Sequence, residues 1–310
     1  MILSLDLNPI VRREYSIDEL SYGNELMAGS FKYAPEGRGI DFSRLLNSFN
    51  EDVLLTGFLG GINGSYIHEI LKGKGIAHDF YPIKDENSNR IVILEKDKAP
   101  VNILERGPRI TREELTGFYE HYSNLIMGTN IICGLGSLPA SVPKDIYFDL
   151  ITIANRSNRR FFLGASGKEL EYGIEAVPYM VVISKSDLES IIKLKLDYRY
   201  EIIKAGKYIL DKGVSIVIID LEDNGSIVLT EEKGYDVEIS NLNLKNINVN
   251  YGHMMAGYTT SFKRNYDYEM TLKLGQASGI VESFFKDRED FDMRDIKKIM
   301  NSVEVSAFNY

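Results

Sequence analysis

The sequence predicts an α/β protein in which helices cover both faces of one large, mostly parallel sheet. Two observations lead to this prediction. Short apolar runs typical of buried strands alternate with segments whose apolar residues recur at helical spacing. The 310 residues contain no repeat, low-complexity tract or linker rich in Pro or Ser. We therefore expect a single domain over residues 1–310, with a small lid sheet whose strands come from about 10–35 and 76–106.

The first third of the chain contains most of the expected strands. Apolar or alternating runs predict strands at 2–7, 53–59, 80–83, 89–95 and 101–105. Helical spacing predicts a helix over 39–49. A second helix follows Gly60-Gly61, and we expect Asn63 to cap it and Gly73-Lys74-Gly75 to end it. Asp97-Lys98 is expected to form a hairpin turn.

The rest of the chain returns to strand–helix alternation. Thr111, with Glu114 three residues later, has the pattern of a capping box at the start of a helix. Strands are predicted at 131–134, 160–163, 180–183, 215–220 and 226–230. Helices are predicted at 111–122, 143–156, 185–193, 197–212, 253–264, 267–285 and 292–303. Folds of this kind bind ligands where the carboxyl ends of the strands meet helix N-termini.

Composition excludes several classes of protein. Acidic residues outnumber basic ones by 45 to 36, for a net charge of −9, which argues against binding to nucleic acid. A single cysteine, Cys133, excludes an internal disulfide and a Cys-rich zinc site and fits a reducing compartment. His68, His78 and His121 are scattered and show no metal-ligand spacing, so we expect no metal bound by these side chains. No apolar run is long enough for a membrane helix, and the first residues lack the basic region of a signal peptide, so we expect a cytoplasmic protein.

Six segments, taken together and in order, resemble the PfkB branch of the ribokinase-like carbohydrate kinases. They are Asn8-Pro9, the loop Gly37-Arg38-Gly39-Ile40-Asp41, residues 57–64, residues 103–108, the turn Gly136-Ser137-Leu138-Pro139, and residues 255–258. The nearest sub-branch is that of tagatose-6-phosphate kinase and 1-phosphofructokinase. The resemblance implies a ribokinase-like fold with a β-lid, a homodimer through that lid, and ATP-dependent, Mg²⁺-dependent phosphorylation of a sugar phosphate.

The catalytic loop departs from the family pattern. The family has a GAGD loop at the start of a helix, where backbone N–H groups receive phosphates and the Asp takes the proton of the sugar hydroxyl. Here that stretch is Val249-Asn250-Tyr251-Gly252, so both loop glycines have changed and the base position is Gly252. Loss of such a base costs roughly 10²–10⁴-fold in rate. His253 is a candidate substitute base, and the alternative is that it simply begins the helix.

The nucleotide side also departs from the pattern. The segment of the family that manages Mg²⁺ and phosphate aligns with 182–187, so its Asn becomes Ser184 and only an acid, Asp187, is retained. A Ser-x-Gly element aligns with Asp220-Leu221-Glu222, and two carboxylates would repel a triphosphate. The resemblance assigns Ser184, Asp187, Asp220, Glu222, Gly225 and Asn250 to this side of the site.

The residues expected to bind the sugar also differ from the family pattern. The Asp that binds sugar hydroxyls after Asn-Pro is Arg12, and the Asn that ends the glycine-rich loop is Asp41. Because these changes reverse the charges, we expect Arg12 and Asp41 to pair across the pocket, with the alternative that both point to solvent. The lid position that carries a phosphate-binding Arg in the sub-branch is Ser88, with Arg90 two residues later. The expected substrate-binding residues are Arg12, Gly37, Arg38, Gly39, Asp41, Ser88 and Arg90.

Three hypotheses about function follow. The first is a degenerate kinase fold with little or no ATP-dependent phosphoryl transfer, which binds a sugar phosphate or another metabolite or has a regulatory role. The second is an active sugar-phosphate kinase that uses substituted residues. The third, an enzyme of another class that reuses the pocket, has no specific support. ATP and Mg²⁺ are implied by the resemblance alone. The catalytic loop 249–252 and the segments 182–187 and 220–222 all depart from the family pattern at the expected ATP site.

Overall fold

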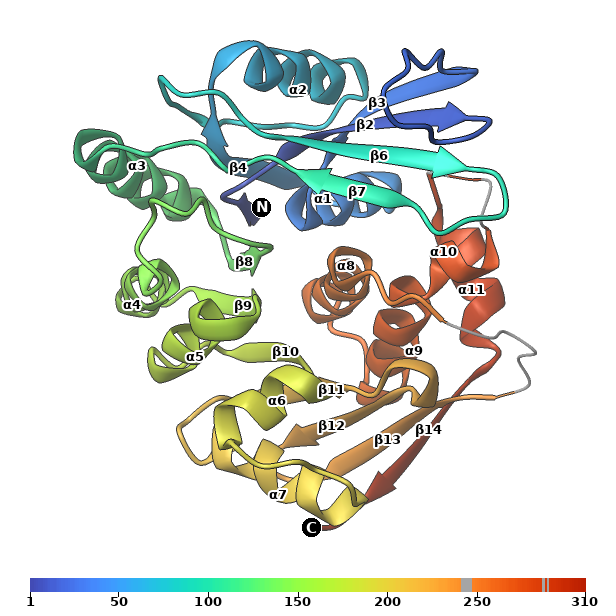
Figure 1. Ribbon diagram of the computed structural model, residues 1–310. Coiled ribbons are helices and arrows are strands. Elements are labelled where there is room, and N and C mark those ends of the chain that lie inside the picture. The colour runs from blue at the N-terminus through green and yellow to red at the C-terminus, as the bar shows by residue number, and fades with distance from the viewer. Residues whose placement is uncertain (241–246, 286–287, 289) are drawn as a thin grey trace.

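A ten-stranded sheet with helices on both faces forms the body of the protein (Figure 1). The structure is a computed structural model that describes residues 1–240, 247–285, 288 and 290–310. The strand order is β14-β13-β12-β11-β10-β9-β8-β1-β4-β5. The bounds are β1 Ile2–Asp6, β4 Val53–Leu59, β5 Tyr81–Pro82, β8 Ile131–Leu135, β9 Arg160–Gly164, β10 Met180–Ser184, β11 Ile216–Asp220, β12 Ser226–Thr230, β13 Gly234–Ile239 and β14 Val303–Phe308. The α/β prediction is thus confirmed.

The direction of the strands changes along the sheet. From β5 to β11 all neighbours are parallel, whereas β11, β12, β13 and β14 pair antiparallel. Every residue of β1, β8 and β11 is buried, because helices cover both faces of the parallel part. This explains why these strands read as continuous apolar runs instead of alternating ones.

Two helical layers enclose two apolar cores. One layer contains α1, α8, α9 and α11, which pack around Phe42, Met255 and Ile296. The other contains α3 to α7, which pack around Phe118, Tyr147 and Leu188. The helices are α1 Arg38–Ser48, α2 Gly61–Gly73, α3 Arg112–Leu125, α4 Ile146–Arg156, α5 Gly167–Glu175, α6 Lys185–Ile192, α7 Arg199–Leu210, α8 Tyr251–Lys263, α9 Tyr268–Gly279, α10 Val281–Phe284 and α11 Met293–Met300.

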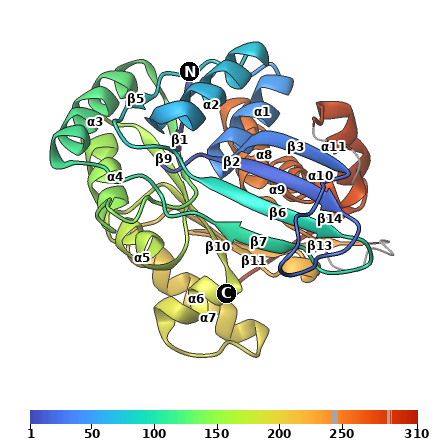
Figure 2. The same ribbon diagram turned by 45° about the horizontal axis from the view of Figure 1, so that its top comes forward.

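A separate sheet of four strands lies beside this body (Figure 2). Its order is β3-β2-β6-β7, with bounds β2 Ile10–Ile17, β3 Ser30–Glu36, β6 Asn89–Glu95 and β7 Val101–Leu104. Strand β2 pairs antiparallel with β3 and parallel with β6. Four chain connections tie this sheet to the body of the protein, namely those from β1 to β2, from β3 to α1, from β5 to β6 and from β7 to α3.

The structure differs from the sequence prediction in several elements. Helix α5 and strands β13 and β14 were not predicted, and the expected helix over 292–303 ends before β14 begins. The expected helix over 267–285 is divided into α9 and α10, because the Gly279 carbonyl accepts the N–H of Asn250. The N-cap of α2 is Gly60, so the predicted cap Asn63 is wrong. Asn63 lies buried in the first turn and donates to the Asn87 carbonyl at 2.7 Å.

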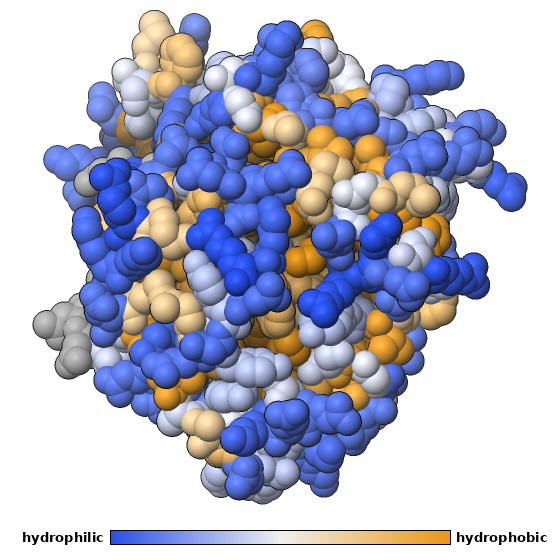
Figure 3. Space-filling model, turned by 180° about the vertical axis from the view of Figure 1, so that it is seen from behind, coloured by the Kyte–Doolittle hydropathy of each residue, from blue (hydrophilic) through white to orange (hydrophobic). Residues whose placement is uncertain are grey.

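Polar side chains cover most of the surface when the molecule is seen from behind, with apolar ones scattered among them (Figure 3). Within the described part of the chain, no helix is both long enough and apolar enough to cross a membrane.

Candidate functional site

Five parallel strands end along one edge of the large sheet, where two helices begin. Strands β1, β8, β9, β10 and β11 end there, and their neighbours in the chain include Asn8, Ser137 and Ser166. The N-termini of α1 and α8 meet at this edge, because Gly252 of α8 packs against the backbone of Arg38. Loops at the carboxyl ends of parallel strands, next to helix N-termini, are the usual ligand site of such folds.

A cavity of about 360 Å³ opens beside the start of α1. It brings together residues from β1, α1, the small sheet and the loops after β8 and β9. Its lining consists of Asp6, Asn8, Ile10, Glu36, Gly37, Arg38, Asp41, Arg90, Leu104, Gly136, Ser137 and Ser166. Four of the expected substrate-binding residues, Gly37, Arg38, Asp41 and Arg90, are therefore at one cavity.

Asp6 is the central residue of this cavity that sequence reasoning missed. It ends β1, is 2% exposed, and its Oδ2 accepts the N–H groups of Gly39 at 2.9 Å and Ile40 at 3.3 Å. Burial raises the pKa of its carboxyl to about 7, although the backbone N–H groups of Gly39, Ile40 and Asn8 act in the opposite direction. The available signal was an acid that ends an otherwise apolar buried strand, since such a charge needs partners.

Arg12 and Asp41 do not form the expected ion pair. Arg12 contacts Glu14 at 2.7 Å, because side chains two residues apart lie on the same face of β2. Asp41 accepts from the Asn250 side chain at 3.0 Å and lies 3.9 Å from Arg44. The predicted pairing is therefore wrong, although Arg12 and Asp41 both line a second cavity of about 560 Å³ next to the first.

The two expected lid residues differ in how they face the cavity. Ser88 is buried and its hydroxyl donates to the Arg106 carbonyl at 2.9 Å, so it holds the loop rather than facing a ligand. Arg90 lines the 360 Å³ cavity and forms a close ion pair with Glu36. Glu36, the residue before the loop that begins at Gly37, therefore neutralises the lid cation.

The start of α8 is filled by the chain itself. The Asn250 side chain caps the helix by accepting the N–H of His253 at 3.1 Å. A side chain at Gly252 has no room, because a Cβ built there would lie 2.4 Å from the Arg38 carbonyl oxygen. Tyr251 donates its hydroxyl to Asp220 at 2.7 Å, and the Arg38 guanidinium lies 5.0 Å from the centre of its ring. The position of the family base is thus occupied by backbone.

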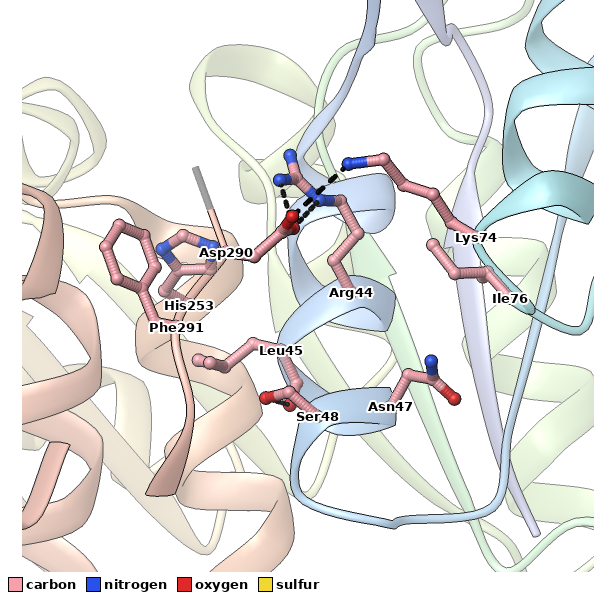
Figure 4. A pocket seen from close by; sticks show the side chains of 9 residues that line it. All are labelled: Arg44, Leu45, Asn47, Ser48, Lys74, Ile76, His253, Asp290 and Phe291. Atoms are coloured by element: carbon pink, nitrogen blue, oxygen red, sulfur yellow. Dashed lines mark hydrogen bonds and ion pairs between the residues drawn. The ribbon is translucent and has the colours of Figure 1, made fainter. Parts of the chain in front are cut away.

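His253 faces a different cavity. Its ring is 3% exposed, with Nδ1 3.4 Å from Glu282 and the ring centre 5.7 Å from that of Phe291. It lines a cavity of about 220 Å³, in which Asp290 contacts Arg44 and Lys74 (Figure 4). Burial lowers the pKa of His253 to about 4, so the imidazole is neutral near pH 7. Since it does not line the cavity of Asp6, the substitute-base hypothesis is not supported.

Two expected nucleotide-side residues hold the starts of α5 and α6. Ser184 caps α6 by accepting the N–H of Asp187, and it donates its hydroxyl to the Asp187 carboxylate at 2.8 Å. The other Asp187 oxygen accepts the N–H of Gly167 at 3.0 Å. The acid that the sequence retains is therefore bonded to protein groups on both oxygens.

The remaining residues of this side lie at the end of β11. Asp220 is buried, which raises the pKa of its carboxyl, and it accepts from Tyr251 and from the N–H of Glu222 at 3.3 Å. Glu222 adopts a left-handed φ of 56°, and Gly225 has φ 79°. A Cβ at Gly225 would lie 1.9 Å from the Val237 carbonyl oxygen, so a glycine is required for the turn into β12.

The histidines that look scattered in the sequence are partly brought together. His78 Nε2 lies 2.8 Å from His68 Nδ1, while the nearest oxygen to His121 Nε2 is the Asp79 carbonyl, at 3.0 Å. Within the described ranges, no group of three His, Cys, Asp or Glu side chains is arranged to hold a metal ion.

Comparisons with known proteins cover nearly the whole chain. The profile of the pfkB family of carbohydrate kinases matches residues 2–281. A tagatose-6-phosphate kinase of Staphylococcus epidermidis is 27% identical over 308 residues, which is 98% of this chain and 99% of that protein. A protein of Thermotoga maritima named as a possible 1-phosphofructokinase has a TM-score of 0.87 at 22% identity, with 100% of both chains covered. Phosphofructokinase-2 of Escherichia coli, solved with fructose-6-phosphate, has a TM-score of 0.85 at 17% identity, covering 97% of this chain and 98% of that one.

Proposed function

The chain belongs to the PfkB family of carbohydrate kinases, and we propose that it binds a sugar or sugar phosphate with little or no ATP-dependent phosphoryl transfer. The observation that carries this proposal is the contact at Gly252. The position of the family base has no carboxylate, and the Arg38 carbonyl oxygen fills the space that any side chain would need. Loss of a general base alone costs roughly 10²–10⁴-fold in rate.

The groups that would receive ATP and Mg²⁺ support the same proposal, because protein donors already contact them. Asp187 and Asp220 each accept a hydrogen bond from a protein group on both oxygens, so a Mg²⁺ ion would have to share these oxygens with protein donors. At the N-terminus of α8, where a phosphate would bind, the side chain of Asn250 already accepts an N–H. Among the described residues, the acids therefore lie where the triphosphate needs positive charge.

Binding of a sugar-class ligand is supported by the cavity beside α1. It holds about 360 Å³, within the range for small-molecule sites, and combines acids with Arg38 and Arg90. Its walls come from the same segments that carry the family motifs at 37–41 and 136–139. Loss of transfer thus does not require loss of the ligand pocket.

The proposal extends to a homodimer through the small sheet. Phe31 and Ile103, which lie on the same face of its strands, are 68% and 49% exposed, which is unusual for side chains of this size on one small sheet. A second copy of the chain could cover them. Sedimentation velocity of the wild type should give a dimer, and Phe31→Glu with Ile103→Glu should give a monomer. A monomeric wild type at micromolar concentration would contradict this part.

The alternative is an active sugar-phosphate kinase that uses substituted residues, and the full-length match to kinases favours it. The test is ADP release with fructose 1-phosphate, fructose 6-phosphate and tagatose 6-phosphate, with ATP binding followed by calorimetry on the same sample. We expect binding of at least one sugar phosphate and no ADP release above that of the protein without sugar. Turnover of about 1–100 s⁻¹, the usual range for kinases, would establish the alternative.

A further inference from the structure

We propose that Asp6 is the ligand-recognition residue of the 360 Å³ cavity: its carboxylate accepts a hydroxyl hydrogen of the bound polyol, and binding therefore expels the proton of its carboxyl. The inference rests on the proposed function, since it assumes that a sugar-class ligand enters this cavity. Nothing in the motifs that assign the family points to this residue, because Asp6 lies in the strand before Asn8-Pro9.

The first support is the geometry of the carboxyl. Asp6 stands at the end of β1 and lines the cavity, although the residue as a whole is 2% exposed. Its Oδ2 serves as the cap of α1, because it accepts the N–H groups of the second and third residues of that helix, Gly39 and Ile40. An ionised carboxylate can accept about four hydrogen bonds, and the Asn8 N–H adds at most a third. At least one lone pair is left for a donor in the cavity.

The second support is the close packing of the start of α1 against the Asp6 side chain. A Cβ at Gly37 would lie 2.1 Å from Asp6 Oδ2, and one at Gly39 would lie 2.6 Å from Asp6 Cβ. The two glycines of the loop therefore allow the start of α1 to close onto Asp6. This places the carboxyl at the bottom of the cavity with a fixed orientation, which is what recognition of a particular hydroxyl requires.

The third support is the balance of acceptors and charges around Asp6. The groups that face Asp6 include Asp41 of α1 and Tyr147 of α4, and the same cavity contains Arg38, Glu36 and Arg90. Arg90 is paired with Glu36, and Arg38 donates to the neutral Gly164 carbonyl at 3.3 Å and keeps its positive charge. Asp6 and Asp41 therefore supply the carboxylate acceptors of the cavity, to which hydroxyl groups of a polyol can donate.

The proton balance follows from the burial of the carboxyl. Because burial raises the pKa of Asp6 to about 7, the free protein carries this proton in about half of its molecules at pH 7. A hydroxyl that donates to the carboxylate stabilises the ionised form. The O–H bond of the Asp6 carboxyl breaks and its proton passes to the buffer base, while the hydroxyl of the ligand keeps its own hydrogen. Binding should release about half a proton at pH 7 and almost none at pH 8.5.

The experiment is calorimetry of fructose and fructose 6-phosphate binding in two buffers that differ in ionisation heat, at pH 7 and pH 8.5. Asp6→Asn keeps one oxygen to cap α1, so it should fold, and Asp295→Asn, at a buried acid that does not line this cavity, is the matched control. We expect about half a proton released at pH 7 by the wild type and by Asp295→Asn, and none by Asp6→Asn. The Asp6→Asn variant should also bind roughly ten- to a hundredfold more weakly, as a hydrogen bond to a charged group is lost.

The outcomes separate this inference from the proposed function. Binding with equal proton release in the wild type and Asp6→Asn overturns the inference and leaves the proposed function intact. Binding of neither probe overturns both. A carboxyl titration of ¹³C-labelled aspartate gives a readout without ligand: the signal missing from Asp6→Asn should titrate near pH 7 in the free wild type. Titration of that signal near pH 4 would also overturn the inference.

Discussion

Helices α1 and α8 begin at the same edge of the sheet, but their N-termini are used differently. The N-terminus of α1 is capped by a carboxylate from another strand, Asp6, beside an open cavity. The N-terminus of α8 is capped by its own amide, Asn250, and its next turn packs on the Arg38 backbone. Under the proposed function, the chain keeps the half of a two-substrate site that lies at α1, while the half at α8 is closed.

The two N-termini also hold buried groups whose effects on stability run in opposite directions with pH. In the folded protein Asp6 has a raised pKa of about 7, so between about pH 4 and 7 the folded state binds more protons than the unfolded state. Its contribution to the free energy of unfolding is full below that window and is lost as the pH rises through it. The loss should be about 4 kcal/mol at most. Urea denaturation from pH 4 to 8 of the wild type and Asp6→Asn measures this, and identical pH slopes would contradict it.

His253, at the start of α8, should give the reverse slope. Burial lowers its pKa to about 4, so the unfolded state binds more protons between about pH 4 and 6.5. The contribution of His253 is full above that window and falls by about 3 kcal/mol as the pH drops through it. Denaturation of His253→Gln should show a steeper decline of stability with rising pH than the wild type does. An unchanged slope would show that His253 titrates normally in the folded state.

Restoring the family base should fail because of space. The Cβ of any residue at 252 meets the Arg38 carbonyl oxygen, so Gly252→Asp should destabilise by about 1–3 kcal/mol and should not raise ADP release. Gly252→Ala is the matched control, since it adds the same Cβ without a carboxylate. Equal destabilisation of the two variants would support the steric account. An Asp variant that is stable and turns over sugar phosphate would refute it.

Asn250 joins the two halves of the site, and its removal should lower the free energy of unfolding by a moderate amount. Its amide donates to Asp41 at 3.0 Å and to Glu282 at 2.9 Å while its oxygen caps α8. Asn250→Ala should cost about 1–2 kcal/mol, the typical value of a cap. Asn250→Ser keeps the cap but loses the bridge, that is, the two hydrogen bonds to Asp41 and Glu282. Thermal denaturation of both variants therefore separates the contribution of the cap to stability from that of the bridge. Equal losses would assign the whole effect to the bridge.

The smallest change in the free energy of unfolding is expected on substitution of Arg12. Its ion pair with Glu14 leaves 45% of the Arg12 side chain exposed, and exposed pairs contribute little. Arg12→Ala should change the free energy of unfolding by less than about 0.5 kcal/mol. Calorimetry of fructose 6-phosphate binding then shows whether Arg12 serves the neighbouring cavity, and a large loss of stability would contradict the assignment as an exposed pair.

Sequence reasoning located the elements better than the contacts between them. Buried strands such as β1 and β11 are clear because both faces are apolar, and the Thr111–Glu114 capping box forms as predicted. The contacts of charged side chains depend on tertiary distances, which is why Arg12 was assigned the wrong partner. Helix α5 is only nine residues long and begins at a glycine, so its pattern is weak.

In the site, too, the residues that come together were easier to predict than the contacts between them. The motifs placed Gly37, Arg38, Asp41 and Arg90 at one cavity, because loops of parallel strands converge at one edge. They could not reveal that Asp6 caps α1, since this contact joins residues more than 30 positions apart through the sheet. Nor could they show that backbone fills the space at Gly252.

The central claim, ligand binding without transfer, can be tested in one ³¹P NMR experiment. The protein is mixed with ATP, Mg²⁺ and fructose 6-phosphate, and the phosphorus signals are followed with time. We predict that the fructose 6-phosphate signal broadens or shifts with protein concentration, as expected for binding, while no sugar bisphosphate or ADP signal grows. Growth of a sugar bisphosphate signal in step with ADP would contradict the account.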